Sequence, residues 1–273
     1  MGLIESRFAE RRGQGRTTLV MYLAVCDPDE GTTLRLLHDL VAAGVDLIEL
    51  AYPFSDPILD GPVIQRANRR ALEAGGDIAT ALRVVRRFRD SDPATPIVLM
   101  GYYHPIVAFG TERFVEAAAE AGVDGLIVAD LPLAHAREDL LPLLGDDYRM
   151  RLIPLSAPML AAADVVDASS GLGGFLYCVA ASGPTGGAAP SVSAVKTEVA
   201  KCRAMGDLPV AVGFGIKTPG DAVAIAAYAD GVVVATALVD LIAEWVEDGL
   251  TEAALSTRVR EYVATFRLAL DAS

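Results

Sequence analysis

The stretch Leu47-Ile-Glu-Leu-Ala-Tyr-Pro-Phe-Ser-Asp-Pro-Ile-Leu-Asp-Gly-Pro62 joins a short apolar run to a loop rich in proline. The apolar run contains one carboxylate, Glu49, and the loop contains Asp56 and Asp60. Burying an unpaired carboxylate is costly, so an acid in the middle of an apolar strand needs a structural or chemical reason. A strand that carries one acid and is followed by a second acid on its loop is typical of an acid–base pair at the rim of a barrel.

Seven further apolar runs of strand length occur along the chain, and segments with helical spacing separate most of them. The eight expected strands are residues 19–25, 47–51, 97–100, 125–129, 152–155, 175–179, 210–213 and 232–235. Runs without polar alternation fit strands that are buried on both faces, as in a parallel sheet. Eight such strands separated by helices predict an α/β protein of the closed (β/α)8 TIM-barrel type.

An open doubly wound sheet is the alternative architecture. It would normally place a Gly-x-Gly-x-x-Gly turn after the first strand, whereas this strand ends in Cys26-Asp-Pro28. A weak internal repeat, Ala-Gly-Val-Asp or Ala-Asp-Gly-Val, leads into strands two, four and eight. No linker or shift in composition divides the chain, so we expect a single TIM-barrel domain over residues 1–273.

The composition excludes several classes of function. The net charge of −13 disfavours nucleic acids and anionic membranes as partners, because both require a basic surface. No apolar run approaches the length of about 18 residues that spans a bilayer, and the charged N-terminus has no signal core, so we expect a soluble cytoplasmic protein. The three cysteines lack metal-ligand spacing, and we expect no metal site.

The last three strands end in turns of glycine and other small residues. These turns are Gly183-Pro-Thr-Gly-Gly187, Gly213-Phe-Gly215 and Ala235-Thr-Ala237. Small residues let backbone N–H groups approach a ligand, and a helix starting near Thr236 would point its positive end inward. The pattern predicts the phosphate site that TIM barrels place after strands seven and eight.

The order of these motifs resembles the α subunit of tryptophan synthase over about residues 8–241. The motifs are Pro53-Phe-Ser-Asp-Pro57 with Asp60-Gly-Pro62, Met100-Gly-Tyr-Tyr-His-Pro105, Gly122-Val-Asp-Gly-Leu-Ile-Val128 with Asp130-Leu-Pro132, Gly183-Pro-Thr-Gly186 and Val212-Gly-Phe-Gly-Ile216. The first of them, following a glutamate within a strand, is highly specific.

The resemblance implies a carbon–carbon lyase of tryptophan biosynthesis that cleaves indole-3-glycerol phosphate to indole and glyceraldehyde 3-phosphate. Glu49 matches the catalytic glutamate, which would protonate the indole ring at C3 and then deprotonate the chain hydroxyl. Asp60 matches the aspartate that stabilises positive charge at the indole N–H. No metal or organic cofactor is implied, because the protonated ring is the electron sink. Pyridoxal phosphate is expected only on a partner β subunit, in an α2β2 complex.

The resemblance also assigns binding roles. The positions that line the indole pocket are Tyr22, Met100, Ile127, Leu155, Tyr177 and Phe214. The positions at the phosphate site are Gly186, Gly215, Ala235 and Thr236. Thr185 would support Asp60 when the loop after strand six closes over the substrate. The β subunit would bind around the loops after strands two, three and six.

The sequence departs from the family pattern at several positions. These are Ala235-Thr236 for Gly-Ser, Cys26 for glycine, Ala51-Tyr52 for Gly-Ile or Gly-Val, and His104 for asparagine. We interpret Tyr52 as a changed partner contact, His104 as a structural residue, and Asp27 and Asp130 as helix caps. Two alternative functions stay open: a stand-alone indole-producing paralogue in a secondary indole pathway, and a non-catalytic activator that binds a β subunit. A phosphosugar isomerase is a third, which does not explain the Pro-Phe-Ser-Asp-Pro loop.

Overall fold

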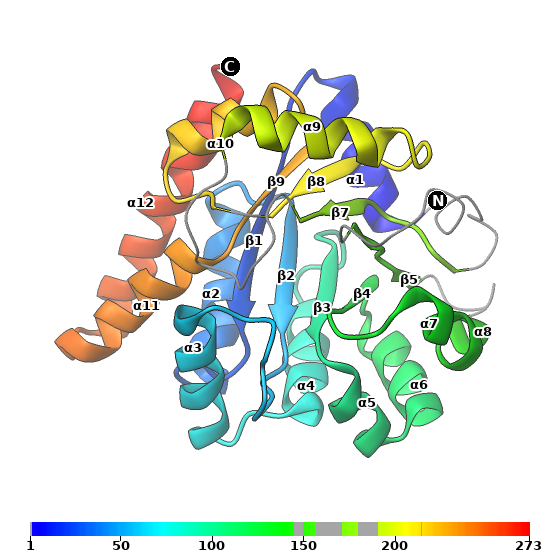
Figure 1. Cartoon of the computed structure of the whole chain (residues 1–273). Helices are drawn as coiled ribbons and strands as arrows, with labels where there is room; N and C mark the ends of the chain where they lie inside the picture. The colour runs from blue at the N-terminus through cyan, green and yellow to red at the C-terminus, as the bar shows by residue number, and fades with distance from the viewer. Residues whose placement is uncertain (1, 145–149, 157–170, 180–190, 214) are drawn as a thin grey trace.

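The computed structural model describes residues 2–144, 150–156, 171–179, 191–213 and 215–273. Its strands all run parallel in one sheet of nine strands, in the order β5-β4-β3-β2-β1-β9-β8-β7-β6. Figure 1 shows these strands surrounded by helices. The strands are β1 Thr18–Ala24, β2 Leu47–Ala51, β3 Ile97–Gly101, β4 Gly125–Val128, β5 Arg151–Leu152, β6 Leu155–Ser156, β7 Leu176–Cys178, β8 Val210–Val212 and β9 Gly231–Val234.

The two terminal strands of this sheet, β5 and β6, are halves of one barrel strand. Pro154 lies between them and has no N–H to donate, which interrupts the ladder. The Ile153 N–H donates to the Leu126 carbonyl at 2.8 Å, and the Tyr177 N–H donates to the Pro154 carbonyl at 2.9 Å. The segment 151–156 thus joins β4 on one side to β7 on the other. The predicted eight-position (β/α)8 barrel is confirmed, with its fifth strand split in two.

Helices cover the outside of this barrel. Many begin with a side-chain cap: Asp29 accepts from the Thr32 N–H, and Asp77 accepts from the Thr80 N–H. The helices are α1 Leu3–Gly13, α2 Glu30–Ala42, α3 Pro62–Glu73, α4 Ile78–Arg89, α5 Tyr103–Phe109, α6 Thr111–Ala121, α7 Leu133–Asp139, α8 Leu141–Leu144, α9 Val192–Arg203, α10 Pro219–Ala226, α11 Thr236–Asp248 and α12 Glu252–Asp271.

Alternate residues of each strand face the helices and the barrel interior. The interior cluster includes Val20, Leu47, Val98 and Ile127, and α1 adds Ile4 and Phe8 to it. Glycines at the start of strands make room for α1: a Cβ on Gly231 would lie 3.1 Å from Phe8, and one on Gly125 would lie 2.9 Å from Ile4. Helix α1 therefore closes the N-terminal end of the barrel, which leaves the end where the strands finish for a ligand site.

Candidate active site

The predicted strand acid, Glu49, faces the barrel interior. Its neighbours Ile48 and Leu50 belong to the cluster under the helices, so the alternation of β2 directs Glu49 inward. In the sheet it lies opposite Tyr22 of β1 and Val98 of β3. The side chain is 1 % exposed, and its Oε2 has no hydrogen-bond partner among the described residues. A buried carboxyl without a partner favours the neutral, protonated form.

The protonation of Glu49 follows from this burial. Loss of solvation raises the pKa of Glu49 to about 8, and the nearby charge of Asp60 acts in the same direction. At neutral pH the group therefore carries a proton. A carboxylic acid in this state can donate that proton to a substrate and then act as a base.

The second predicted acid, Asp60, lies on the loop between β2 and α3. The Tyr102 hydroxyl donates to its Oδ2 at 3.1 Å and accepts from the Leu59 N–H at 3.0 Å. Gln65 Nε2 donates to the Asp60 carbonyl at 2.8 Å. Burial raises the pKa of Asp60 to about 6, and the Tyr102 hydrogen bond opposes that shift. Asp60 is thus a carboxylate at neutral pH, beside a protonated Glu49.

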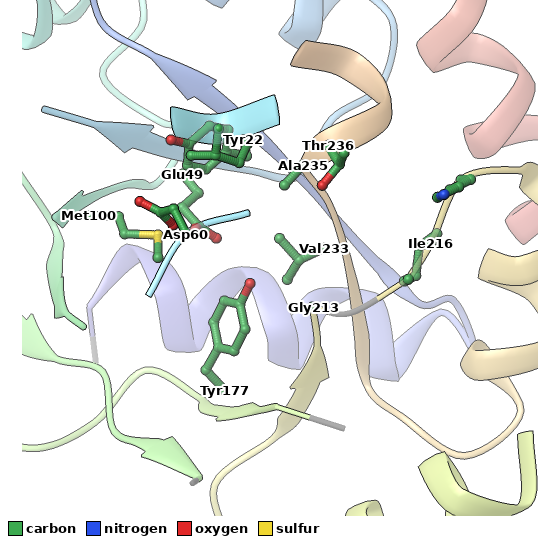
Figure 2. A pocket seen from close by; sticks show the side chains of 13 residues that line it. Tyr22, Glu49, Asp60, Met100, Tyr177, Gly213, Ile216, Val233, Ala235 and Thr236 are labelled. Atoms are coloured by element: carbon green, nitrogen blue, oxygen red, sulfur yellow. The ribbon is translucent and has the colours of Figure 1, made fainter. Parts of the chain in front are cut away.

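One cavity brings these two acids together with an apolar wall and the small-residue turns. Figure 2 shows Glu49, Asp60 and Tyr22 on one side of it, with Tyr177 pointing in from another side. Its lining residues are Tyr22, Glu49, Asp60, Ile64, Met100, Tyr177, Gly213, Gly215, Ile216, Lys217, Val233, Ala235 and Thr236. A Cβ on Gly213 would lie 2.0 Å from the Tyr177 hydroxyl, so only glycine fits there. The arrangement suits a flat apolar ring bound between two acids.

The far side of the cavity has the features of an anion site. Helix α11 begins at Thr236, and within the described ranges no side chain caps it. The Leu238 and Val239 N–H groups donate to the Ala235 carbonyl at 3.0 and 3.1 Å, so it is the N–H groups before them that can face a ligand. Gly215, with φ 72°, and Ala235 lie at the turns beside it. The N-terminus of a helix of 13 residues attracts anions through these N–H groups and its dipole.

Comparisons with known proteins agree with this geometry. A family model described as tryptophan synthase alpha chain matches residues 8–267. The chain belongs to the tryptophan synthase alpha chain family. It is therefore a carbon–carbon lyase of tryptophan biosynthesis, an α subunit that cleaves indole-3-glycerol phosphate.

Relatives in this family cover nearly the whole chain. The chain is 47 % identical over 274 residues to the tryptophan synthase alpha chain of Halorhodospira halophila, covering 99 % of this chain and 97 % of the relative. It is 44 % identical over 249 residues to that of Granulibacter bethesdensis, covering 91 % and 89 %. The crystal structure of tryptophan synthase subunit alpha from Legionella pneumophila is 33 % identical, covers 100 % of both chains and superposes with a TM-score of 0.89.

The residues that the family resemblance assigned are distributed unevenly around the cavity. Glu49, Asp60, Tyr22, Met100 and Tyr177 line it, as do Gly215, Ala235 and Thr236. Ile127 and Leu155 do not; Ile127 is 1 % exposed and both pack in the interior cluster beside Tyr177. Thr185, Gly186 and Phe214 lie outside the described residues.

Tyr52 corrects one interpretation. Its side chain is 2 % exposed, so it cannot be a contact with a partner. The ring lies against Gly101, where an added Cβ would be 2.2 Å from it, and its hydroxyl donates to the Tyr102 carbonyl at 2.9 Å. The sequence could not reveal this pairing, because Gly101 is far away in the chain.

Asp27 and Asp130 do not cap the helices that follow them, contrary to the prediction from the sequence. Asp27 is buried and accepts two hydrogen bonds from Arg70 of α3, at 2.7 and 2.8 Å, while Asp29 caps α2. Asp130 accepts from the Tyr103 N–H at 2.7 Å, so it caps α5 on the neighbouring strand's loop instead of the helix that follows it. Cys26 has φ 62°, a left-handed conformation that favours the glycine usual in the family.

Several cavity or support residues were not assigned a role from the sequence, among them Val233. Ile64 and Lys217 line the cavity, and Tyr102 holds Asp60. Tyr102 lies inside the motif Met100-Gly-Tyr-Tyr-His-Pro105, which was a usable signal. His104 of the same motif is exposed and stacks beside Phe54 at 5.9 Å, away from the cavity. Among the described residues there is no cluster of potential metal ligands and no helix able to span a membrane.

Proposed function

We propose that Glu49 transfers the protons in the cleavage of indole-3-glycerol phosphate and that Asp60 stabilises the charged ring. The observation that supports this most is the buried, unpartnered Glu49 carboxyl oxygen within the described chain, facing the same cavity as Asp60. A pKa of about 8 makes Glu49 a proton donor at neutral pH, and a pKa of about 6 leaves Asp60 charged. The two acids thus have opposite protonation states, which is how one site provides both an acid and a counter-charge.

The reaction balances with these two groups. The Glu49 acid donates its proton to C3 of the indole ring, which places a positive charge on the ring nitrogen. The Asp60 carboxylate accepts a hydrogen bond from the indole N–H and stabilises that charge. The Glu49 carboxylate then removes the proton of the hydroxyl on the carbon attached to C3. That carbon becomes the aldehyde of glyceraldehyde 3-phosphate, the bond to C3 breaks, and its electrons neutralise the ring as indole.

We assign no metal and no organic cofactor to this chain, because the protonated ring accepts the electrons of the broken bond. Tyr22, Met100 and Tyr177 are proposed to hold the indole ring, together with Ile127, Leu155 and Phe214 from the resemblance. Gly215, Ala235, Thr236 and the first turn of α11 are proposed to bind the phosphate, with Gly186. Thr185 is proposed to support Asp60 after loop closure.

A tryptophan synthase β subunit that carries pyridoxal phosphate is the proposed partner, in an α2β2 complex in the cytoplasm. Solved relatives include tryptophan synthase from Mycobacterium tuberculosis in an aminoacrylate-bound form, with a TM-score of 0.83. Three apolar side chains are exposed on the loop after β2 and on α5: Ile58 at 76 %, Leu59 at 46 % and Val107 at 52 %. Exposed apolar groups of this kind favour a protein partner.

Indole release from indole-3-glycerol phosphate tests the proposal. The purified protein, Glu49→Gln and the control Glu10→Gln are assayed with and without a β subunit. Glu10 is an exposed glutamate on α1, at the opposite end of the barrel. We expect Glu49→Gln to reduce turnover by about 10² to 10⁴-fold and Glu10→Gln to leave it unchanged.

The same assay separates the remaining alternatives. Release that requires the β subunit supports the synthase complex, and equal release without it supports a stand-alone lyase. Substrate binding without release in any mixture would leave only the non-catalytic activator. Full activity of Glu49→Gln would overturn the proposed role of Glu49.

A further inference from the structure

The negative charge of the protein opposes the binding of an anionic phosphate in this cavity, and backbone N–H groups offset this repulsion only in part. The chain has a net charge of −13, and Glu49 and Asp60 line the same cavity as the expected phosphomonoester. Ala235 adds a methyl group at the turn where the phosphate would approach α11. Among the described residues that line the cavity, Lys217 is the only one with a cationic side chain.

The backbone of Lys217 is fixed beside the phosphate turn. Lys217 lies two residues after Gly215, and its N–H donates to Asp221 Oδ2 at 3.1 Å. Asp221 and Thr218 form the capping box that begins α10. The Tyr262 hydroxyl of α12 donates to the Lys217 carbonyl at 3.3 Å. These contacts from two helices hold the backbone of Lys217 at the cavity rim, and the residue is exposed.

The Lys217 ammonium is also uncommitted. The chain has three lysines, and two have partners: Lys201 pairs with Glu198 at 2.7 Å, and Lys196 lies over the Tyr228 ring at 5.2 Å. Within the described ranges Lys217 has no ion pair and no ring contact. A free cation at the rim of an anion site is available to bind a phosphate.

Most of the neighbouring carboxylates form contacts with other residues. Asp221 accepts the hydrogen bonds of the capping box, and Asp240 of α11 lies 3.8 Å from Arg66. Glu244, which lines the adjoining groove with Lys217, pairs with Arg258 at 2.8 Å. Glu261 lines that groove as well. Asp221 and Asp240 act on Lys217 through space, but within the described ranges neither forms an ion pair with its ammonium. The ammonium can therefore still pair with a phosphate dianion in the cavity.

We propose that Lys217 is the cationic ligand of the substrate phosphate, opposite the N-terminus of α11. The inference rests on the proposed phosphate site and adds to it a side chain that discriminates in favour of a dianionic phosphomonoester. Its ammonium would donate to a phosphate oxygen from the β8 side, while the N–H groups of α11 donate from the β9 side.

Binding of sn-glycerol 3-phosphate, measured by isothermal titration calorimetry, tests this role without catalysis. Lys217→Met removes the charge and keeps an apolar stem, Lys217→Arg keeps the charge, and Lys201→Met removes the same charge from α9. We expect Lys217→Met to weaken binding about tenfold, the lower end for a charge-assisted hydrogen bond at an exposed site. Lys217→Arg should retain most of the affinity, and Lys201→Met should match the unmodified protein.

Steady-state kinetics with indole-3-glycerol phosphate supply a second measurement. Lys217→Met should raise KM about tenfold and change kcat little, because the ammonium is at the phosphate end and not at the breaking bond. Its KM should also depend less on salt concentration than that of the unmodified protein. Circular dichroism confirms that each variant is folded.

Two outcomes would overturn the inference, and they differ in what else they remove. If Lys217→Met binds glycerol 3-phosphate and turns over substrate like the unmodified protein, Lys217 is not a ligand but the lyase function stands. If the unmodified protein neither binds glycerol 3-phosphate nor releases indole, the proposed phosphate site and the lyase mechanism fail together.

Discussion

Two carboxylates three residues apart, Asp46 and Glu49, show how differently this barrel treats a buried acid. Both side chains are almost inaccessible, at 0 and 1 % exposure. Asp46 accepts hydrogen bonds from the Leu19 N–H at 2.9 Å, from Arg11 at 2.6 Å and from Arg267 at 2.9 Å. Glu49 Oε2 has no partner in the described part of the chain. The acid just before β2 contacts the first and last helices, and the acid inside β2 is left free for chemistry.

The two acids lie toward opposite ends of the TIM barrel, where the N-terminal end contributes stability and the C-terminal end carries the active site. Arg11 belongs to α1 and Arg267 to α12, so the Asp46 cluster ties both ends of the chain to the N-terminal end of the barrel. Glu49 faces the end where the strands finish and where the loops can supply Asp60. Partners make a buried charge tolerable, whereas their absence keeps a proton on the acid.

The largest expected effect on stability comes from breaking the Asp46 cluster. Asp46→Asn removes the charge that faces Arg267, whose side chain is nearly buried, and should lower the free energy of unfolding by about 3 to 5 kcal/mol. Unfolding by denaturant at pH 7 measures the loss. Glu49→Gln is the matched control and should show no such loss. If the Asp46→Asn variant were as stable as the unmodified chain, the ion pairs of Asp46 would not stabilise the fold as proposed.

Replacing Glu49 should have the opposite effect on stability. Its pKa is raised to about 8 in the fold from an ordinary value of 4.5, so the folded state binds more protons and loses stability as pH rises through this window. Glu49→Gln has no such charge and should be more stable than the unmodified chain at pH 9, by up to about 5 kcal/mol, with little difference at pH 4. Thermal unfolding at both pH values measures this. Equal stability at pH 9 would contradict a raised pKa.

The pH dependence of activity should report both acids of the cavity. The value of kcat/KM should fall above about pH 8, where Glu49 loses its proton, and below about pH 6, where Asp60 gains one. Asp60→Asn cannot titrate and should lose the acidic limb while keeping the basic one. A profile that is flat from about pH 5 to about pH 9 in the unmodified protein would contradict the assignment of acid and counter-charge.

A smaller effect is expected from the hydroxyl that holds Asp60. Tyr102→Phe removes the hydrogen bond that opposes the rise in the pKa of Asp60, so the acidic limb of the pH profile should move to higher pH. The value of kcat/KM at pH 7 should fall about tenfold. Tyr52→Phe removes only a hydrogen bond to the Tyr102 carbonyl, so the acidic limb of its kcat/KM profile should stay at the same pH. A similar shift in both variants would indicate general disturbance instead of a specific role.

The sequence predicted the features that depend on residues close to one another in the chain. The apolar runs indicated the strands, and the spacing from Glu49 through Pro53-Phe-Ser-Asp-Pro57 to Asp60 indicated the two acids. The split at Pro154 was not predicted, because the sequence does not show which strand each half pairs with. The predictions for Thr185, Gly186 and Phe214 stay predictions.

Features that depend on distant residues were missed. Tyr52 packs on Gly101 and donates to Tyr102, about 50 residues later in the chain, so its burial depends on the packing of β2 against β3. Nothing in the sequence distinguishes Lys217 from an ordinary surface lysine, because its position at the cavity rim depends on the fold of the barrel. A family pattern assigns roles to matching positions, but it does not reveal contacts made by residues that depart from it.

A direct titration of the Glu49 carboxyl is the most decisive measurement. The protein is labelled with glutamate carrying ¹³C at the side-chain carboxyl, and the Glu49 signal is identified by its loss in Glu49→Gln. We predict that this carbon titrates with a pKa of about 8, well above the ordinary value of 4.5. A Glu49 signal that titrates near the ordinary value of 4.5 would contradict the account, because the acid would then be charged at neutral pH and could not donate the first proton.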